Sequence, residues 1–125
     1  MSNRFTRWAV GLTLAVAAGH IAWAQGTTKI GFHAGLTGPA AADGNAALAA
    51  AKLAVEQANA GGGVNGRKLE LVVYDDQGKP EQAVPSANRL IGDGARAVVS
   101  GGFSGPSRAA APVFQKAQIP YLAAV

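Results

Sequence analysis

Residues 92–125 read GDGARAVVSGGFSGPSRAAAPVFQKAQIPYLAAV, and this stretch decides the fold. A short β-branched run over residues 97–99 predicts a buried strand, which breaks into a glycine and serine turn over residues 100–107. The alanine-rich residues that follow predict a helix, with Pro106 in its first turn. Residues 119–122 then open another strand. A strand that leads through a helix into the next strand is typical of a parallel sheet.

Two further strand–helix pairs precede this stretch. Residues 28–36 are predicted as the first strand, and they end in a loop at residues 37–39. Residues 46–60 are strong helix formers, and either Asp43 or Asn45 is expected to cap this helix. The chain therefore begins with the same alternation of strand and helix that ends it.

The middle of the chain repeats the pattern. Residues 68–74 alternate apolar and other side chains and predict a second strand, and residues 80–91 predict a second helix. Because proline lacks an N–H group, either this helix begins near Val84 or it bends at Pro85. The whole order predicts an α/β fold, with a parallel sheet that carries helices on both faces.

The first 24 residues have the features of a secretory signal peptide. A basic start at residues 4–7 precedes an apolar run over residues 8–18, and Ala-Trp-Ala at residues 22–24 is a small-x-small cleavage pattern. A membrane-spanning helix needs about 20 continuous apolar residues, and His20 interrupts this run. We therefore expect cleavage before Gln25, a periplasmic location and no stable membrane insertion afterwards.

Removal of this segment changes the composition of the chain. The full sequence carries 11 Lys and Arg against 7 Asp and Glu, a net charge of +4. Without Arg4 and Arg7, residues 25–125 have nine Lys and Arg against the same seven acids, a net charge of +2. The basic excess belongs mostly to the targeting segment, so it does not indicate a nucleic-acid partner. The chain has no cysteine, which excludes disulfides and a lipid anchor on cysteine.

Three motifs suggest other chemistry, and the sequence argues against each. Residues 61–66, GGGVNG, fit G-x-G-x-x-G but follow a helix and precede a strand, the reverse of a dinucleotide-binding turn. Asp75 and Asp76 are expected to serve a turn and a helix start, because a hard cation needs more oxygen ligands. His33 lies in a strand, without partners for zinc or a Ser-His-acid triad. We expect no cofactor, no metal and no enzymatic activity.

Three segments in order carry a resemblance to a known family. They are IGFHAGLTGP, AAKLAVEQANAGGGVNGRKLELVVYDDQGKPEQA and NRLIGDGARAVVSGGFSGPSRAAAPVFQKAQIPYL. Residues 25–125 resemble the N-terminal lobe of the branched-chain amino-acid-binding family, the type I periplasmic binding proteins of ABC importers. The resemblance implies a small-molecule ligand held between two lobes that close about a hinge, delivery to an ABC permease, and a lobe that is only partly present here.

The resemblance also implies the ligand-binding residues. The turn after the third strand supplies donors to the ligand's α-carboxylate in the family, and Ser104 matches its serine, with Gly102 and Phe103 just before. Ser104 is expected at the N-cap of the third helix, so the alternative is a cap without contact to ligand. Thr37 lies in a loop that borders the cleft, and Val125 begins the loop after the fourth strand.

Two points remain open from the sequence. Residues 41–44 read AADG, where an aromatic side chain often packs on the ligand in this family, so the identity of the ligand is open. The alternative classes are an exported flavodoxin-like enzyme or signalling domain, and a truncated product without activity.

Overall fold

The computed structural model describes residues 26–125, and within them four strands alternate with helices. In chain order these elements are β1 (Thr28–Ala34), the short 3₁₀ helix η1 (Gly38–Ala40), α1 (Ala41–Ala60), β2 (Leu69–Asp75), α2 (Pro80–Gly92), β3 (Ala97–Gly101), α3 (Ser104–Lys116) and β4 (Tyr121–Ala124). The predicted signal peptide and its cleavage site lie outside the described residues.

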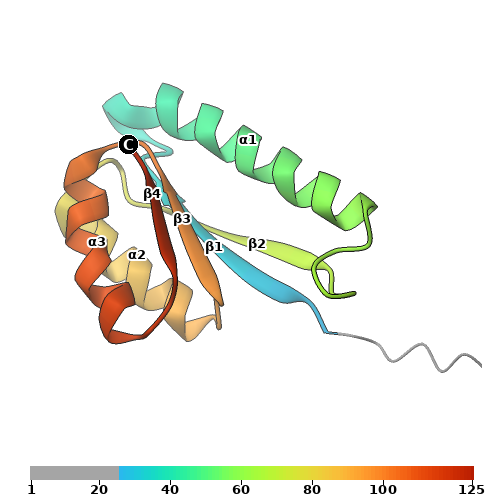
Figure 1. Cartoon of the computed structure of the whole chain (residues 1–125). Coiled ribbons are helices and arrows are strands. Elements are labelled where there is room, and N and C mark those ends of the chain that lie inside the picture. Colours follow the sequence, from blue (N-terminus) through green and yellow to red (C-terminus); the bar gives the residue numbers. More distant parts are fainter. Residues whose placement is uncertain (1–25) are drawn as a thin grey trace, which may run out of the picture.

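The strands form one parallel sheet in the order β2-β1-β3-β4. α1 covers one face of this sheet, and α2 and α3 pack side by side on the other (Figure 1). All carboxyl ends of the strands lie at the end of the molecule where α1 and α3 begin (Figure 1). The predicted α/β class, with a parallel sheet between helices, is confirmed.

Period-two alternation along the strands assigns side chains to the two faces. Ile30 and Phe32 of β1 face α1, where they line an apolar cavity of about 270 Å³ with residues such as Val55. Gly31 faces the other way, and a Cβ there would meet Val98 and Leu90. The larger core lies on that second face and consists of Ala83, Ala87, Leu90, Ala95, Val98, Ala110 and Phe114.

α1 begins earlier than the sequence predicted, at Ala41 instead of residue 46. Neither predicted cap is correct, because Ala40 occupies the N-cap position and makes no side-chain hydrogen bond. Asn45 lies inside the helix, and its amide nitrogen donates to the carbonyls of Leu36 (3.1 Å) and Ala41 (2.7 Å). Asn45 therefore ties α1 to the turn after β1 instead of capping the helix.

α2 and α3 both continue through an internal proline. α2 spans Pro80–Gly92 and includes Pro85, so the alternative start near Val84 is wrong. α3 includes Pro112 in the same way, and its N-cap residue is Phe103, without a side-chain cap hydrogen bond. The expectation that Ser104 is the N-cap is therefore wrong, since Ser104 is the first residue of the helix.

The strand boundaries differ slightly from the predicted ones. β1 ends at Ala34, two residues before the predicted end, and β3 continues to Gly101. β4 starts at Tyr121 and forms one edge of the described sheet, with Leu122 66% exposed.

Candidate functional site

The strand order has a switch point between β1 and β3 at the carboxyl edge of the sheet. β2 pairs with β1 on one side, and β3, the next strand in the chain, pairs with β1 on its other side. Such a switch point is where open α/β sheets bind ligands, because the loops after the two central strands diverge there. The loop after β1 contains Thr37, and the loop after β3 contains Gly102 and Phe103 and leads into Ser104, the first residue of α3.

Asp75 holds the loop after β1 in place. Its carboxylate accepts hydrogen bonds from the Leu36 amide (2.8 Å), the Thr37 hydroxyl (2.6 Å) and the Gln77 amide (2.7 Å). Partial burial works against the ionised form, but the hydrogen bonds, that from Thr37 first, outweigh it and hold the pKa of Asp75 below its ordinary value. Thr37 is exposed, and its hydroxyl proton is already directed to Asp75.

The loop after β3 presents three of the predicted residues in succession. Gly102 has φ of +135°, a conformation that favours glycine, and its amide donates to the Ala124 carbonyl (3.1 Å). Phe103 is 45% exposed, and its ring lies 3.6 Å from the Cβ position of Gly78. Within residues 26–125 the Ser104 hydroxyl has no hydrogen-bond partner. This exposed hydroxyl at the start of α3 is therefore available to a ligand, and it caps nothing.

A shallow hollow of about 250 Å³ lies beside the N-terminal half of α3. It is lined by Ser104, Ser107, Arg108, Ala111, Tyr121, Ala123 and Val125. Two predicted residues, Ser104 and Val125, thus come together although they are far apart in sequence. Thr37, Gly102 and Phe103 do not line this hollow; they lie on the neighbouring loops. The hollow is largely apolar, with hydroxyl groups and the exposed Arg108 at its boundary.

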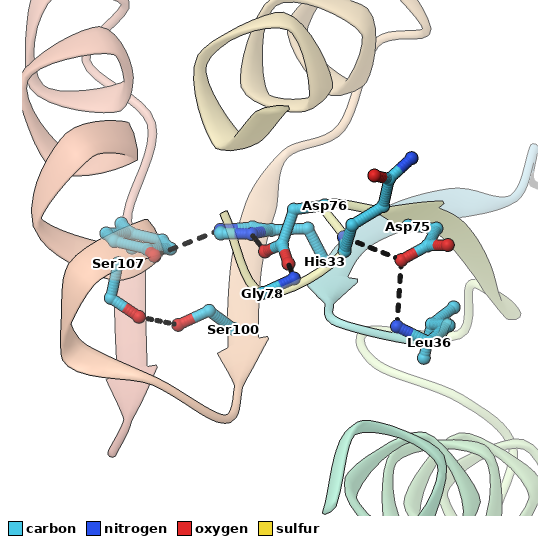
Figure 2. A network of polar contacts seen from close by, with 9 residues as sticks. His33, Leu36, Asp75, Asp76, Gly78, Ser100 and Ser107 are labelled. Carbon is cyan, nitrogen blue, oxygen red and sulfur yellow. Dashed lines mark hydrogen bonds and ion pairs between the residues drawn. The ribbon is translucent and has the colours of Figure 1, made fainter. Parts of the chain in front are cut away.

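A buried polar layer beneath the carboxyl edge was not found by sequence reasoning. His33 contacts Asp76 through Nδ1 (2.7 Å) and Tyr121 through Nε2 (3.0 Å). Ser100 and Ser107 share a buried hydroxyl–hydroxyl bond of 2.9 Å, which gives Ser107 a structural role. Figure 2 shows both sets close to each other. The sequence held one indication of this layer. His33 follows Phe32 in the same strand, so the two side chains point to opposite faces and His33 faces α2 and α3.

The motifs with alternative chemistry are structural in the described part of the chain. Gly61, Gly62 and Gly63 end α1, and the turn that follows is closed by paired hydrogen bonds between Val64 and Arg67. The G-x-G-x-x-G pattern is thus a helix end and a turn, as the sequence predicted. Asp75 and Asp76 both accept amide hydrogen bonds in the turn before α2. Residues 26–125 contain no group of three potential metal ligands.

No helix between residues 26 and 125 has both the length and the hydropathy needed to cross a bilayer.

The comparisons with known proteins agree with this geometry. Residues 27–125 match the family model described as periplasmic binding protein. The chain is 37% identical over 114 residues to the leucine-, isoleucine-, valine-, threonine- and alanine-binding protein of Pseudomonas aeruginosa, which covers 91% of this chain and 30% of that protein. It is 41% identical over 93 residues to the Leu/Ile/Val-binding protein BraC3 of Rhizobium johnstonii, over 74% of this chain and 25% of the relative.

Solved structures give the same result. The isoleucine complex of the branched-chain amino acid transporter substrate-binding protein LivJ from Streptococcus pneumoniae superposes with a TM-score of 0.75 at 35% identity, over 78% of this chain and 28% of that one. A solute-binding protein of an ABC transporter from Rhodopseudomonas palustris, in complex with 3,4-dihydroxybenzoic acid, superposes with a TM-score of 0.71 at 30% identity. The match covers 78% of this chain and 26% of that one. The chain spans less than a third of the length of these relatives.

These relatives are named as binding proteins and not as enzymes, so the enzyme alternative is set aside. Their common fold is the parallel sheet with helices on both faces described above, as in the lobe of a type I periplasmic binding protein. The chain belongs to the periplasmic binding protein family, with the fold of a type I lobe.

Proposed function

We propose that this chain is part of the substrate-binding component of an ABC importer for branched-chain or related amino acids. Residues 1–24 act as a signal peptide, and residues 25–125 form part of the N-terminal lobe of a periplasmic protein. A second lobe supplies the rest of the site, and the complete protein delivers its ligand to a permease. The family membership and the size of the matched relatives support this proposal.

The observation that carries the ligand assignment is the unpartnered hydroxyl of Ser104 at the start of α3. The amides of Ser104 and Gly105 belong to the first turn, where backbone N–H groups lack partners within the helix. These donors and the positive end of the helix dipole favour a carboxylate. The adjacent hollow, apolar along Ala111 and Ala123, suits an aliphatic side chain. Gly102 and Phe103 shape the loop, and Thr37 and Val125 border the ligand.

The test is a Ser104→Ala substitution in a two-lobed protein that contains residues 25–125. Calorimetry with a panel of amino acids first identifies the ligand. Losing one hydrogen bond to a charged group costs about 1.5–3 kcal/mol, so the affinity is expected to fall about tenfold or more. Ser107→Ala is the matched control for stability: it leaves the buried Ser100 hydroxyl without a partner and lowers the free energy of unfolding.

Ser104→Ala is expected to leave that free energy unchanged, because its hydroxyl has no partner within residues 26–125. An unaltered affinity in the folded variant would remove Ser104 from the site. Failure of every amino acid to bind the unmodified protein would overturn the proposed ligand class. N-terminal sequencing of the exported protein tests the processing site, and a start other than Gln25 contradicts it.

A further inference from the structure

His33 is a fully buried histidine that joins two other buried or half-buried polar side chains. The exposed fraction of His33 is 0% and that of Asp76 is 2%. Nδ1 of His33 lies 2.7 Å from Asp76 Oδ2, and Nε2 lies 3.0 Å from the Tyr121 hydroxyl. None of the proposed ligand contacts involves His33 or Asp76. A buried polar set of this kind needs every partner in place, because each unpaired group there is costly.

The donor and acceptor pattern fixes the direction of the hydrogen bond between His33 and Asp76. Asp76 accepts the Gly78 amide through Oδ1 (2.8 Å), and its carboxylate offers only acceptors to His33. Nδ1 of His33 therefore carries a hydrogen. In the neutral imidazole Nε2 is then the acceptor, and the Tyr121 hydroxyl donates to it. The carboxylate thus orients the ring, and the ring orients the tyrosine.

The three residues come from three elements that the backbone does not join directly. His33 belongs to β1, Asp76 to the turn between β2 and α2, and Tyr121 to the edge strand β4. β3 lies between β1 and β4 in the sheet, so the His33–Tyr121 contact reaches across it. The Tyr121 ring also stacks on His33, with centroids 5.7 Å apart and planes at 13°.

Both ends of this chain of contacts reach the proposed ligand region. Tyr121 lines the hollow that holds Ser104 and Val125. At the other end, the position of a Cβ on Gly78 lies within 4 Å of the Phe103 ring. A displacement of His33 would therefore move the wall of the hollow and the turn that supports Phe103.

We infer that Asp76, His33 and Tyr121 form a positioning chain for the ligand hollow, with His33 as its central residue. The positioning chain fixes Tyr121 in the wall of the hollow, and it connects the edge strand β4 to the turn before α2. This inference rests on the proposed function for its consequence in binding. The hydrogen-bond chain itself is independent of any ligand, and the experiment uses that difference.

The experiment compares Tyr121→Phe with Tyr74→Phe. Each substitution removes one hydroxyl and keeps the ring. The Tyr74 hydroxyl donates to Asp93 Oδ2 (2.7 Å) and makes no hydrogen bond to Asp76, His33 or Tyr121. Tyr74 pairs in register with His33 on the neighbouring strand, so Tyr74→Phe is a matched control for the loss of a hydroxyl close to the ring. The first measurement is ligand-free ¹⁵N NMR of the His33 ring in the full chain. The second is isoleucine affinity in the two-lobed protein.

We expect a protonated Nδ1 and a hydrogen-bonded Nε2 in the unmodified chain. Tyr121→Phe is expected to shift the Nε2 resonance and the Val125 amide. It is also expected to weaken isoleucine binding by at most about tenfold, because the hydrogen bond that holds Tyr121 in the wall of the hollow is lost. Tyr74→Phe is expected to change none of these. A proton on Nε2 with none on Nδ1, or an Nε2 resonance unaffected by Tyr121→Phe, contradicts the proposed chain of hydrogen bonds. A shifted resonance with unchanged affinity overturns its positioning role. Absence of isoleucine binding in the unmodified protein instead counts against the proposed ligand, while the NMR result still decides the chain.

Discussion

Asp75 illustrates how single side chains shape the candidate site. Its two carboxylate oxygens hold the loop after β1 and the turn before α2 at the same time. Because the pKa of Asp75 is lowered in the folded protein, ionised Asp75 contributes stability above the unfolded value of about 3.8. This contribution is lost as the pH falls through the lower pKa of the folded state.

Thr37→Val removes the hydroxyl that donates to Asp75 and keeps the shape of the side chain. The variant is expected to have a lower free energy of unfolding at pH 6–7, and this difference is expected to shrink as the pH falls below about 3.8. Urea denaturation of both proteins at a series of pH values measures it. A difference that stays constant over the whole pH range would show that the Asp75 carboxylate is not involved.

At the scale of the elements, α1 is held against the end of β1 by two glycines. A Cβ on Gly44 would overlap the carbonyl oxygen of Gly35, a backbone atom that no side-chain movement can displace. This close approach explains why α1 can begin immediately after η1 and cover the sheet. It also makes the position intolerant of any side chain.

Gly44→Ala is therefore expected to lower the free energy of unfolding by about 1–3 kcal/mol or more, as overpacking does. Gly92→Ala, in the last turn of α2, is the matched control, because nothing lies within 4 Å of its Cβ position. That variant is expected to be unchanged or more stable by up to about 1 kcal/mol. Urea unfolding compares the two, and equal losses would contradict the packing argument.

Local patterns predicted the elements, and the misses have local causes. An alanine side chain cannot cap a helix, and residues 40–42 are all alanines. The sequence therefore predicted a start near Asp43 or Asn45, which is too late for α1. Phe103, the N-cap residue of α3, likewise has no side-chain group that could cap the helix, so the sequence pointed to Ser104 instead. The Ser104 region was found because a strand, a small-residue turn and a helix are adjacent in sequence. His33 and Asp76 are 43 residues apart, and His33 and Tyr121 are 88 apart, so no local pattern joins them.

On the proposed function, residues 26–125 form one side of the ligand site. Ser104, the first amides of α3 and Thr37 are accessible, but Thr37 already donates its proton to Asp75. Val125 is 70% exposed, and the hollow beside it is shallow. Charged hydrogen bonds that stay open to solvent contribute little, because water competes for the same groups.

The described chain is therefore expected to bind amino acids with a dissociation constant of about 1 mM or weaker, equivalent to about −4 kcal/mol. Association costs several kcal/mol in lost freedom of motion, which one open lobe does not offset. NMR titration of residues 25–125 with isoleucine measures this value. Micromolar binding would contradict the need for a second lobe.

The position of β1 has a consequence for the order in which the sheet assembles. β1 is the first strand of the described chain, yet it lies between β2 and β3, whose pairing with it starts at Leu69 and Ala97. Neither ladder forms until the chain has closed a long loop, and such loops delay folding. While the ribosome makes the intervening helices, β1 has no partner. β1 is therefore expected to stay without a ladder partner until synthesis has passed β2, at Asp75.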